Sequence, residues 1–319
     1  MLKKLSLLNN RHIQTLYAPF FRKFPKTKFI IERFNLKDKD FVEAYWYKQK
    51  PKKNQPIVVL FHGLAGSYKS PYIQGAMQEL ENRGFASVLM HFRGCSGKDN
   101  LLPRSYHSGD TEDARAYITH LHKSYPKSKL HAIGYSIGGN MLLKLLGKDG
   151  LNTPLLSAIS VSAPLDLDIC ANTIDRGFAK IYQAYLLKPL KEQLKRKFLQ
   201  FDMKQFIDLK ANNIDKIKTI REFDNLYTAP INSFKNANNY YKRCSAKQYL
   251  KDIKIPTLII HALDDPFMTP DILPKKSEIF NSITLKVVPY GGHVGFIKGS
   301  IFKPEYTLDS IVSDFFTSF

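Results

Sequence analysis

The sequence predicts an α/β protein: a mostly parallel, twisted sheet flanked by helices, with a helical lid inserted after the sixth strand. Two observations predict this class. Apolar runs without alternation, such as residues 56–61, are typical of central strands covered on both faces. These runs alternate with helix-length segments, which is the rhythm of right-handed β-α-β units. The rhythm stops at about residue 168 and resumes at 255, so the insertion lies between them.

The strands and helices are expected in a regular order along the chain. Residues 27–36 and 41–49 form a strand pair around the polar turn at 37–40, because β-forming residues fill the second segment. Apolar runs and helical spacing mark the later elements. Strands are expected at 56–61, 86–92, 129–135, 154–163, 255–261 and 283–290, and helices at 71–82, 109–124, 137–146 and 306–318.

The interruption at residues 168–245 is rich in lysine and helical in period. Five of its apolar residues recur three or four positions apart, namely Leu187, Leu190, Leu194, Phe198 and Phe201. A chain of 319 residues can bury a large core, so we expect a single domain over residues 1–319. Residues 168–245 are the lid segment within that domain.

The composition excludes a disordered chain, and the charge is unevenly distributed. Hydrophobic residues make up 44% and aromatic residues 13%, enough to form a core. The formal net charge is +20. Residues 1–55 hold 14 basic and 4 acidic residues, and the lid segment holds 15 and 8. No pattern of a DNA-binding or RNA-binding module accompanies this charge, so no nucleic-acid partner is expected.

The basic regions permit a different partner. Residues 16–23 combine aromatic residues with positive charge, as peripheral lipid-facing segments do. This pattern predicts contact with an anionic membrane surface near the site entrance. Ordinary solvated lysine surfaces are the alternative. The sequence makes no prediction of the oligomeric state.

The cysteines and the chain start bear on the compartment. Cys95, Cys170 and Cys244 form an odd, widely spaced set without a CxxC pair, which favours a reducing compartment. The first ten residues have too short an apolar run for a signal peptide, and no run is long enough to span a membrane. We expect a cytoplasmic location, with peripheral contact at the inner membrane face.

Residues 134–138, Gly-Tyr-Ser-Ile-Gly, form a G-x-S-x-G motif between an expected strand and an expected helix. That context is typical of a nucleophile elbow, in which a strained turn exposes the serine. Ser136 is therefore the candidate nucleophile, and the N–H of Ile137 can stabilise a developing oxyanion. The alternative is a serine that merely caps a glycine-flanked helix.

A nucleophilic serine needs a base and an orienting acid, which follow in the order Ser, acid, His in this arrangement. His293, within a glycine-rich loop after the last strand, is the candidate base. After Ser136 the chain offers only one other histidine, His261, on a strand. Asp265 is the candidate acid, and its neighbour Asp264 is the alternative.

A second oxyanion donor is expected from the loop at residues 62–67, His-Gly-Leu-Ala-Gly-Ser, where the N–H of Leu64 is the candidate. An ordinary glycine turn is the alternative. No metal-binding motif, no Walker lysine motif and no GxGxxG after a strand is present. Neither a metal nor a cofactor is expected.

These residues together resemble the α/β-hydrolase superfamily and, within it, the YheT-like hydrolase family. The resemblance runs from residue 10 to 296 and rests on several stretches: 10–16, 62–67, 70–73, 92–97, 106–109, the Ser136 motif, 264–267 and 292–296. It implies a carboxylic-ester hydrolase with a Ser136–Asp265–His293 triad. Relatives in this family are associated with lipid esters. The candidates for lining the site are His62, Tyr135, Arg93 and His107. For Arg93 and His107, the alternative is a hydrogen-bonding role beneath the site.

Three functions follow as expectations. The first is hydrolysis of short-chain, medium-chain or lipid esters through an acyl-enzyme. The second is transfer of the same acyl group to an alcohol, as an ester synthase does. The third is a non-catalytic protein that binds anionic partners. The expected substrate is a small-molecule or lipid ester.

Overall fold

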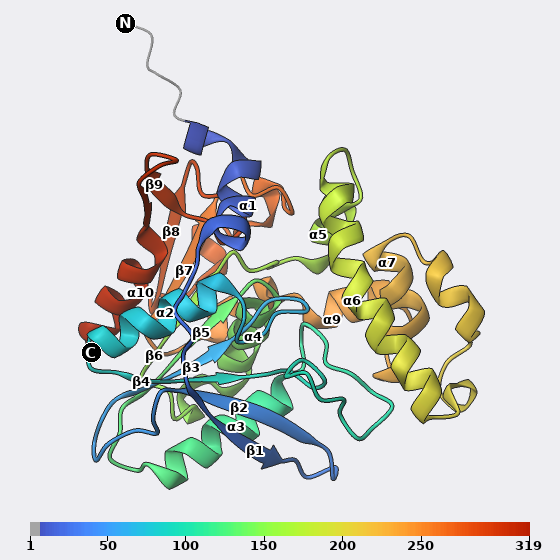
Figure 1. Ribbon diagram of the computed structural model, residues 1–319, viewed down its shortest axis with the longest axis horizontal. Coiled ribbons are helices and arrows are strands. Elements are labelled where there is room, and N and C mark those ends of the chain that lie inside the picture. Colours follow the sequence, from blue (N-terminus) through green and yellow to red (C-terminus); the bar gives the residue numbers. More distant parts are fainter. Residues whose placement is uncertain (1–6) are drawn as a thin grey trace, which may run out of the picture.

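The computed structural model describes residues 7–319, and an eight-stranded sheet forms its centre (Figure 1). The strand order is β1-β2-β4-β3-β5-β6-β7-β8. Strands β3 to β8 are parallel, and β2 pairs antiparallel with both β1 and β4. The strands are β1 Phe29–Asn35, β2 Phe41–Tyr47, β3 Ile57–Phe61, β4 Ala86–Met90, β5 Leu130–Tyr135, β6 Ser157–Val161, β7 Thr257–Ala262 and β8 Ile283–Val288.

Helices cover both faces of this sheet, which explains why its central strands do not alternate. The side chains of β3 show it: Val59 belongs to a core shared with α3 (Thr111–Ser124) and α4 (Ile137–Asp149). Val58 belongs to a core shared with α2 (Pro71–Asn82) and α10 (Thr307–Thr317). All five residues of β3 are fully buried. The predicted α/β class is confirmed.

The chain between β6 and β7 is helical and projects to one side of the sheet (Figure 1). Its helices are α5 Leu167–Ile174, α6 Ala179–Gln200, α7 Ile220–Phe223, α8 Ala229–Ile231 and α9 Ala237–Cys244. Leu187, Leu190 and Leu194 of α6 pack into a small core of this segment's own. Phe198 and Phe201 both pack against that core, although Phe201 lies just past the end of the helix.

Three further elements, one helix and two short strands, had no counterpart in the sequence prediction. Helix α1 (Arg11–Phe21) begins at Asn10, whose side chain accepts hydrogen bonds from the N–H groups of His12 and Ile13. Strands β9 (Ile297–Gly299) and β10 (Pro304–Tyr306) form a short antiparallel hairpin.

Short helical turns complete the described chain. They are the 3-10 helices Leu7–Asn9, Gly150–Asn152, Met203–Gln205, Ala211–Lys216, Ala246–Asp252, Pro270–Ile272 and Lys276–Glu278, and the π-helix Asp224–Thr228. Within residues 7–319, no helix is long and apolar enough to cross a bilayer.

Candidate active site

Ser136 occupies the sharp turn between β5 and α4. Its backbone has φ 52° and ψ −123°, a conformation that is costly for any residue with a side chain. A Cβ on Gly134 would lie 2.3 Å from the carbonyl oxygen of Gly138, and a Cβ on Gly138 would lie 2.6 Å from that of Phe61. The two glycines therefore permit the close packing of strand and helix that this turn requires.

His293 and Asp265 lie beside Ser136, although they come from distant parts of the chain. His293 Nε2 lies 3.0 Å from Ser136 Oγ, and His293 Nδ1 lies 2.8 Å from Asp265 Oδ2. The other carboxylate oxygen of Asp265 accepts a hydrogen bond from the N–H of Phe267 at 2.9 Å. The Phe267 ring also stacks on the imidazole, with 4.2 Å between ring centroids. The carboxylate and the imidazole are thus held in fixed orientations.

Asp264, the alternative acid, points elsewhere. Its Oδ1 accepts hydrogen bonds from the N–H groups of Gly291 and Gly292, each at 2.9 Å. Its other oxygen, Oδ2, is buried and has no partner among residues 7–319. Asp264 therefore holds the loop that carries His293, whereas Asp265 contacts the imidazole.

The N-terminal helix also supports the His293 loop. Thr15 Oγ1 accepts a hydrogen bond from the N–H of His293 at 2.9 Å. The buried side-chain amide of Gln14 bonds to both the N–H and the carbonyl of Ile297, at 2.7 and 2.8 Å. Sequence reasoning did not assign these roles to Gln14 and Thr15. The only available signal was their place in the stretch 10–16 that carries the family resemblance.

The N–H groups of Leu64 and Ile137 are available as donors near Ser136. Both residues line the same cavity as Ser136, and within residues 7–319 neither N–H donates a hydrogen bond. The Gly63 carbonyl accepts from His62 Nδ1 at 2.7 Å and from the N–H of Gly66 at 3.0 Å. Since C=O and N–H point in opposite directions across a trans peptide, this arrangement turns the Leu64 N–H away from His62.

A cavity of about 830 Å³ opens above Ser136 and His293. Its walls come from the loop after β3, from α1, and from the segment between β6 and β7. Most of the wall residues are apolar, including Leu16, Ile174 and Leu186. This size is ample for a small-molecule ligand, for which cavities of roughly 300–1,000 Å³ are usual. The arrangement can bind an apolar group beside an activated hydroxyl.

Two residues expected to line the site lie beneath it instead. His62 is fully buried, and its Nε2 accepts a hydrogen bond from the N–H of Phe92 at 3.1 Å. Burial lowers the pKa of His62 to about 3, so the ring is neutral. Tyr135 is also fully buried and packs against the ring of Tyr72, outside the cavity wall. The expectation is corrected for both, because their side chains point into the protein core.

Arg93 is also removed from the cavity, whereas His107 lines it. The Arg93 guanidinium is 2% exposed and pairs with Asp113 and Asp40, at 2.6 and 2.9 Å. Its role is to hold these buried carboxylates together, which agrees with the alternative of hydrogen bonding beneath the site and not with a site-lining arginine. His107 is neutral, because burial and the positive charges of Lys144, Arg104 and Arg243 lower its pKa to about 3.

The cysteines and possible metal ligands add no competing chemistry in the part of the chain that the structure describes. Cys170 lines the cavity, but burial raises the pKa of its thiol, which keeps it protonated and a poor nucleophile. Cys95 is half-buried, and desolvation raises the pKa of its thiol to about 12. No group of three or more His, Cys, Asp or Glu residues among residues 7–319 could hold a metal ion.

Comparison with solved structures shows the fold. The esterase Pf2001 of Pyrococcus furiosus matches with a TM-score of 0.58. The match covers 92% of this chain and 93% of that one, and the identity is 17%. At this level of identity the likeness extends to the fold alone.

Comparison with sequences shows the family. The family model described as "alpha/beta hydrolase fold" matches residues 56–300. "Putative esterase YheT" of Escherichia coli (strain K12) is 40% identical over 312 residues, or 98% of this chain and 91% of that protein. "Phospholipase ABHD3" of Mus musculus is 31% identical over 293 residues, which cover 90% of this chain and 71% of that protein. The chain therefore belongs to the α/β-hydrolase family, as a YheT-like member.

Proposed function

We propose that this protein, a carboxylic-ester hydrolase of the α/β-hydrolase family, cleaves acyl or lipid esters through a covalent acyl-enzyme on Ser136. One observation carries the proposal: His293 lies 3.0 Å from Ser136 Oγ and 2.8 Å from Asp265 Oδ2. A serine hydroxyl is a weak nucleophile until an adjacent base can take its proton. The pair of contacts supplies both the base and the acid that orients it.

The first half of the reaction forms the acyl-enzyme. Asp265 accepts the Nδ1–H of His293, which leaves the lone pair of Nε2 facing Ser136. Ser136 Oγ attacks the ester carbonyl carbon while Nε2 takes its proton. The carbonyl oxygen becomes negatively charged, and the N–H groups of Leu64 and Ile137 stabilise it. When the tetrahedral intermediate collapses, His293 protonates the departing alcohol oxygen and the acyl group stays on Ser136.

The second half regenerates the enzyme. His293 Nε2 takes a proton from water, whose oxygen attacks the acyl carbonyl. The same two N–H groups stabilise the second oxyanion. His293 then returns the proton to Ser136 Oγ, and the carboxylic acid leaves. An alcohol in place of water gives transesterification, which is the alternative fate of the same intermediate.

The shape of the cavity supports an ester with an apolar acyl group. Its largely apolar wall can remove an alkyl chain from water. Each CH₂ group that is buried in this way contributes about 0.8 kcal/mol of favourable transfer free energy. The segment between β6 and β7 provides much of that wall, so we assign it the role of a lid, residues 168–245, within a single domain. A relative named as a phospholipase favours lipid esters among the candidates.

The entrance supports contact with a lipid surface. Phe20 of α1 is 70% exposed, and Tyr185 of α6 is 78% exposed. Both line the cavity at its mouth. The two helices touch, since His12 Nδ1 and the hydroxyl of Tyr182 lie 3.0 Å apart. The aromatic residues of these helices therefore form one surface. The exposed Lys69 lines the same cavity, and the exposed Lys23 follows the end of α1. Such a combination suits peripheral docking on anionic lipid.

A panel of p-nitrophenyl esters, from acetate to palmitate, tests the proposal on the wild type and on Ser136→Ala. The wild type should hydrolyse a contiguous range of chain lengths, and Ser136→Ala should lose several orders of magnitude in kcat. Near-normal activity of Ser136→Ala would overturn the assignment. Added ethanol separates hydrolysis from acyl transfer through the ethyl ester that transfer produces. No activity on any ester would favour a non-catalytic binding protein.

A further inference from the structure

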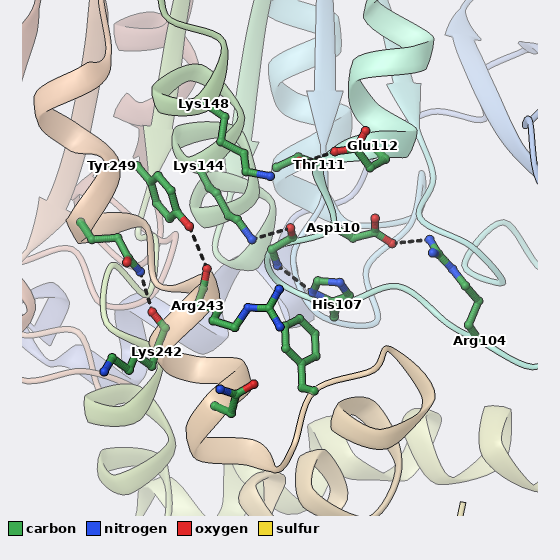
Figure 2. Close-up of a pocket in the computed structure, with 14 residues that line it drawn as sticks. Arg104, His107, Asp110, Thr111, Glu112, Lys144, Lys148, Lys242, Arg243 and Tyr249 are labelled. Carbon is green, nitrogen blue, oxygen red and sulfur yellow. Dashed lines mark hydrogen bonds and ion pairs between the residues drawn. The ribbon is translucent and has the colours of Figure 1, made fainter. Parts of the chain in front are cut away.

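A second cavity, of about 560 Å³, lies beside the first and is lined by charged side chains (Figure 2). Residues 107–109 separate the two, and His107 contributes to the wall of both. The elements around it are the N-terminus of α3, the second half of α4, and residues 234–249, which include α9. Ser136 and His293 do not line it, so it is distinct from the candidate active site.

Cationic groups converge in this cavity without forming direct ion pairs. Figure 2 shows the amino groups of Lys144 and Lys148 and the guanidinium of Arg243 pointing into the same space. None of the three forms an ion pair with a carboxylate within residues 7–319. Like charges so close together repel one another unless an anion lies between them. An anionic ligand would convert this repulsion into attraction.

The acidic groups of the cavity are already paired with other arginines. Asp110 pairs with Arg104 at 2.8 Å. Glu112 pairs with Arg115 at 2.6 Å. Neither carboxylate forms an ion pair with Lys144, Lys148 or Arg243, although Asp110 interacts with Lys144 and Glu112 with Lys148 electrostatically over a longer distance. The cavity is lined by five cationic and two acidic side chains, so its net charge is positive.

Lys144 is the strongest single indication of a missing anion. Its side chain is 7% exposed, and its ammonium donates to the carbonyl of Gly109 at 3.0 Å and to the sulfur of Cys244 at 3.3 Å. An ammonium has three protons to donate, so one remains without an acceptor among the described residues. A buried charge without a counter-ion is costly. The third proton is therefore available to a ligand in the cavity.

The N-terminus of α3 adds further donors. Asp110 occupies the N-cap position, but its side chain makes no capping hydrogen bond. Thr111 and Glu112, the first residues of this 14-residue helix, line the cavity. Uncapped N–H groups and the helix dipole favour a phosphate or another anion at such an end.

We propose that this basic cavity binds the phosphate group of a phosphorylated small molecule. A phosphoryl group offers three terminal oxygens, which matches convergent donors from Lys144, Lys148, Arg243 and the start of α3 better than a two-oxygen carboxylate does. The volume leaves room for an organic part beside the phosphate. Phe234 and Tyr249 add apolar surface to the wall, and their rings also contact Arg243 and Lys144, at 5.0 and 5.9 Å from the ring centroids.

Calorimetric titration and thermal unfolding of the full-length protein test the site. The probes are inorganic phosphate and glucose 6-phosphate, each compared with chloride at equal ionic strength. Both should raise the Tm, and added salt should weaken the binding. Tighter binding of glucose 6-phosphate assigns a phosphorylated molecule as the ligand. Tighter binding of inorganic phosphate would assign the free ion and overturn the larger ligand.

Variants locate the binding. The double variant Lys148→Gln/Arg243→Gln should lose at least tenfold in affinity, because both residues are exposed and their removal leaves the fold intact. Lys123→Gln is the matched control, an exposed lysine on α3 outside the cavity. Hydrogen exchange at Thr111 and Glu112 should slow when phosphate binds.

The double variant should hydrolyse p-nitrophenyl esters at the wild-type rate, which keeps this proposal separate from the catalytic one. No rise in Tm at 10 mM of either probe, or unchanged affinity in the double variant, would refute the site.

Discussion

His62 donates a hydrogen bond from Nδ1 to the carbonyl oxygen of Gly63, its own neighbour in the chain, over 2.7 Å. The N–H of Phe92 donates to the other ring nitrogen, which fixes the Nδ1–H tautomer. The carbonyl so held belongs to the peptide that carries the Leu64 N–H. His62 therefore orients one proposed oxyanion donor without touching the substrate.

Replacement of His62 by phenylalanine should release this peptide. We expect kcat to fall by about tenfold or more with little change in KM, because the donor matters most when the oxyanion forms. An alkylboronic acid, which forms a tetrahedral adduct with a serine, should bind more weakly in the same proportion. His131→Gln is the control, since His131 is equally buried but bonds to Ser157, far from the cavity. Equal losses in both variants would indicate a general packing defect.

The two adjacent aspartates should respond differently to the same change. Asp265→Asn leaves His293 without the carboxylate that sets its tautomer, so kcat should fall by about 10³–10⁴-fold while the protein stays folded. In Asp264→Asn, the amide oxygen can still accept from Gly291 and Gly292, though more weakly than a carboxylate. That variant should lose about 1–3 kcal/mol of stability and less than about tenfold in kcat. Steady-state kinetics and urea unfolding measure both. The reverse ranking would assign Asp264 as the acid.

Sequence reasoning succeeded where the evidence is local and failed where it depends on packing. Ser136 could be placed because its motif lies between a strand and a helix, and steric contacts of the glycines enforce that turn. The choice between Asp264 and Asp265 depends on which way adjacent side chains point, and the sequence analysis preferred Asp265, which is the one that contacts His293. Arg93 lies in a stretch that carries the resemblance, but its role is a buried ion-pair cluster.

Other features could not be predicted because their parts are far apart in the chain. Thr15 accepts a hydrogen bond from His293 although the two residues are 278 positions apart in the sequence, and no local sequence pattern predicts such a contact. The basic cavity likewise combines residues near 110, 144 and 243, each of which looks like an ordinary surface charge in the sequence. Two of the cavity's cations, Lys242 and Arg243, belong to the basic segment 168–245, whereas Lys144 and Lys148 lie outside both basic regions.

Asp224 should make stability depend on pH. It lines the catalytic cavity, and its carboxylate accepts a hydrogen bond from the hydroxyl of Tyr241 at 2.8 Å. Burial raises its pKa to about 6, whereas an unfolded aspartate titrates near 3.8. The folded state therefore binds this proton more tightly than the unfolded state does. The stability that protonated Asp224 contributes is fully present below about pH 4 and is lost as the pH rises through about 6.

Asp224→Asn removes this titration. From pH 4 to pH 7, the free energy of unfolding of the wild type should fall relative to the variant by about 2–3 kcal/mol. Urea unfolding at several pH values measures the difference. A constant difference across this range would show that Asp224 keeps an ordinary pKa.

The aromatic entrance should govern binding to lipid vesicles. Phe20 and Phe21 are 70% and 66% exposed at the end of α1, so neither contributes much to the core. Phe20→Ser/Phe21→Ser should reduce flotation with vesicles that contain anionic lipid, while hydrolysis of a water-soluble p-nitrophenyl ester stays near the wild-type rate. Neutral vesicles should bind the wild type less well than anionic ones, because exposed lysines adjoin the aromatic surface.

Leu199→Ser is the control for this prediction. Leu199 is 86% exposed, and it lies near the far end of α6, about 27 Å along the helix axis from Ile181 at the cavity mouth. Its loss removes a similar apolar side chain but not the entrance surface. If Leu199→Ser reduces flotation as much as the double variant does, contact with lipid is not localised to the cavity mouth. If the wild type binds anionic and neutral vesicles equally, the lysines do not contribute to docking.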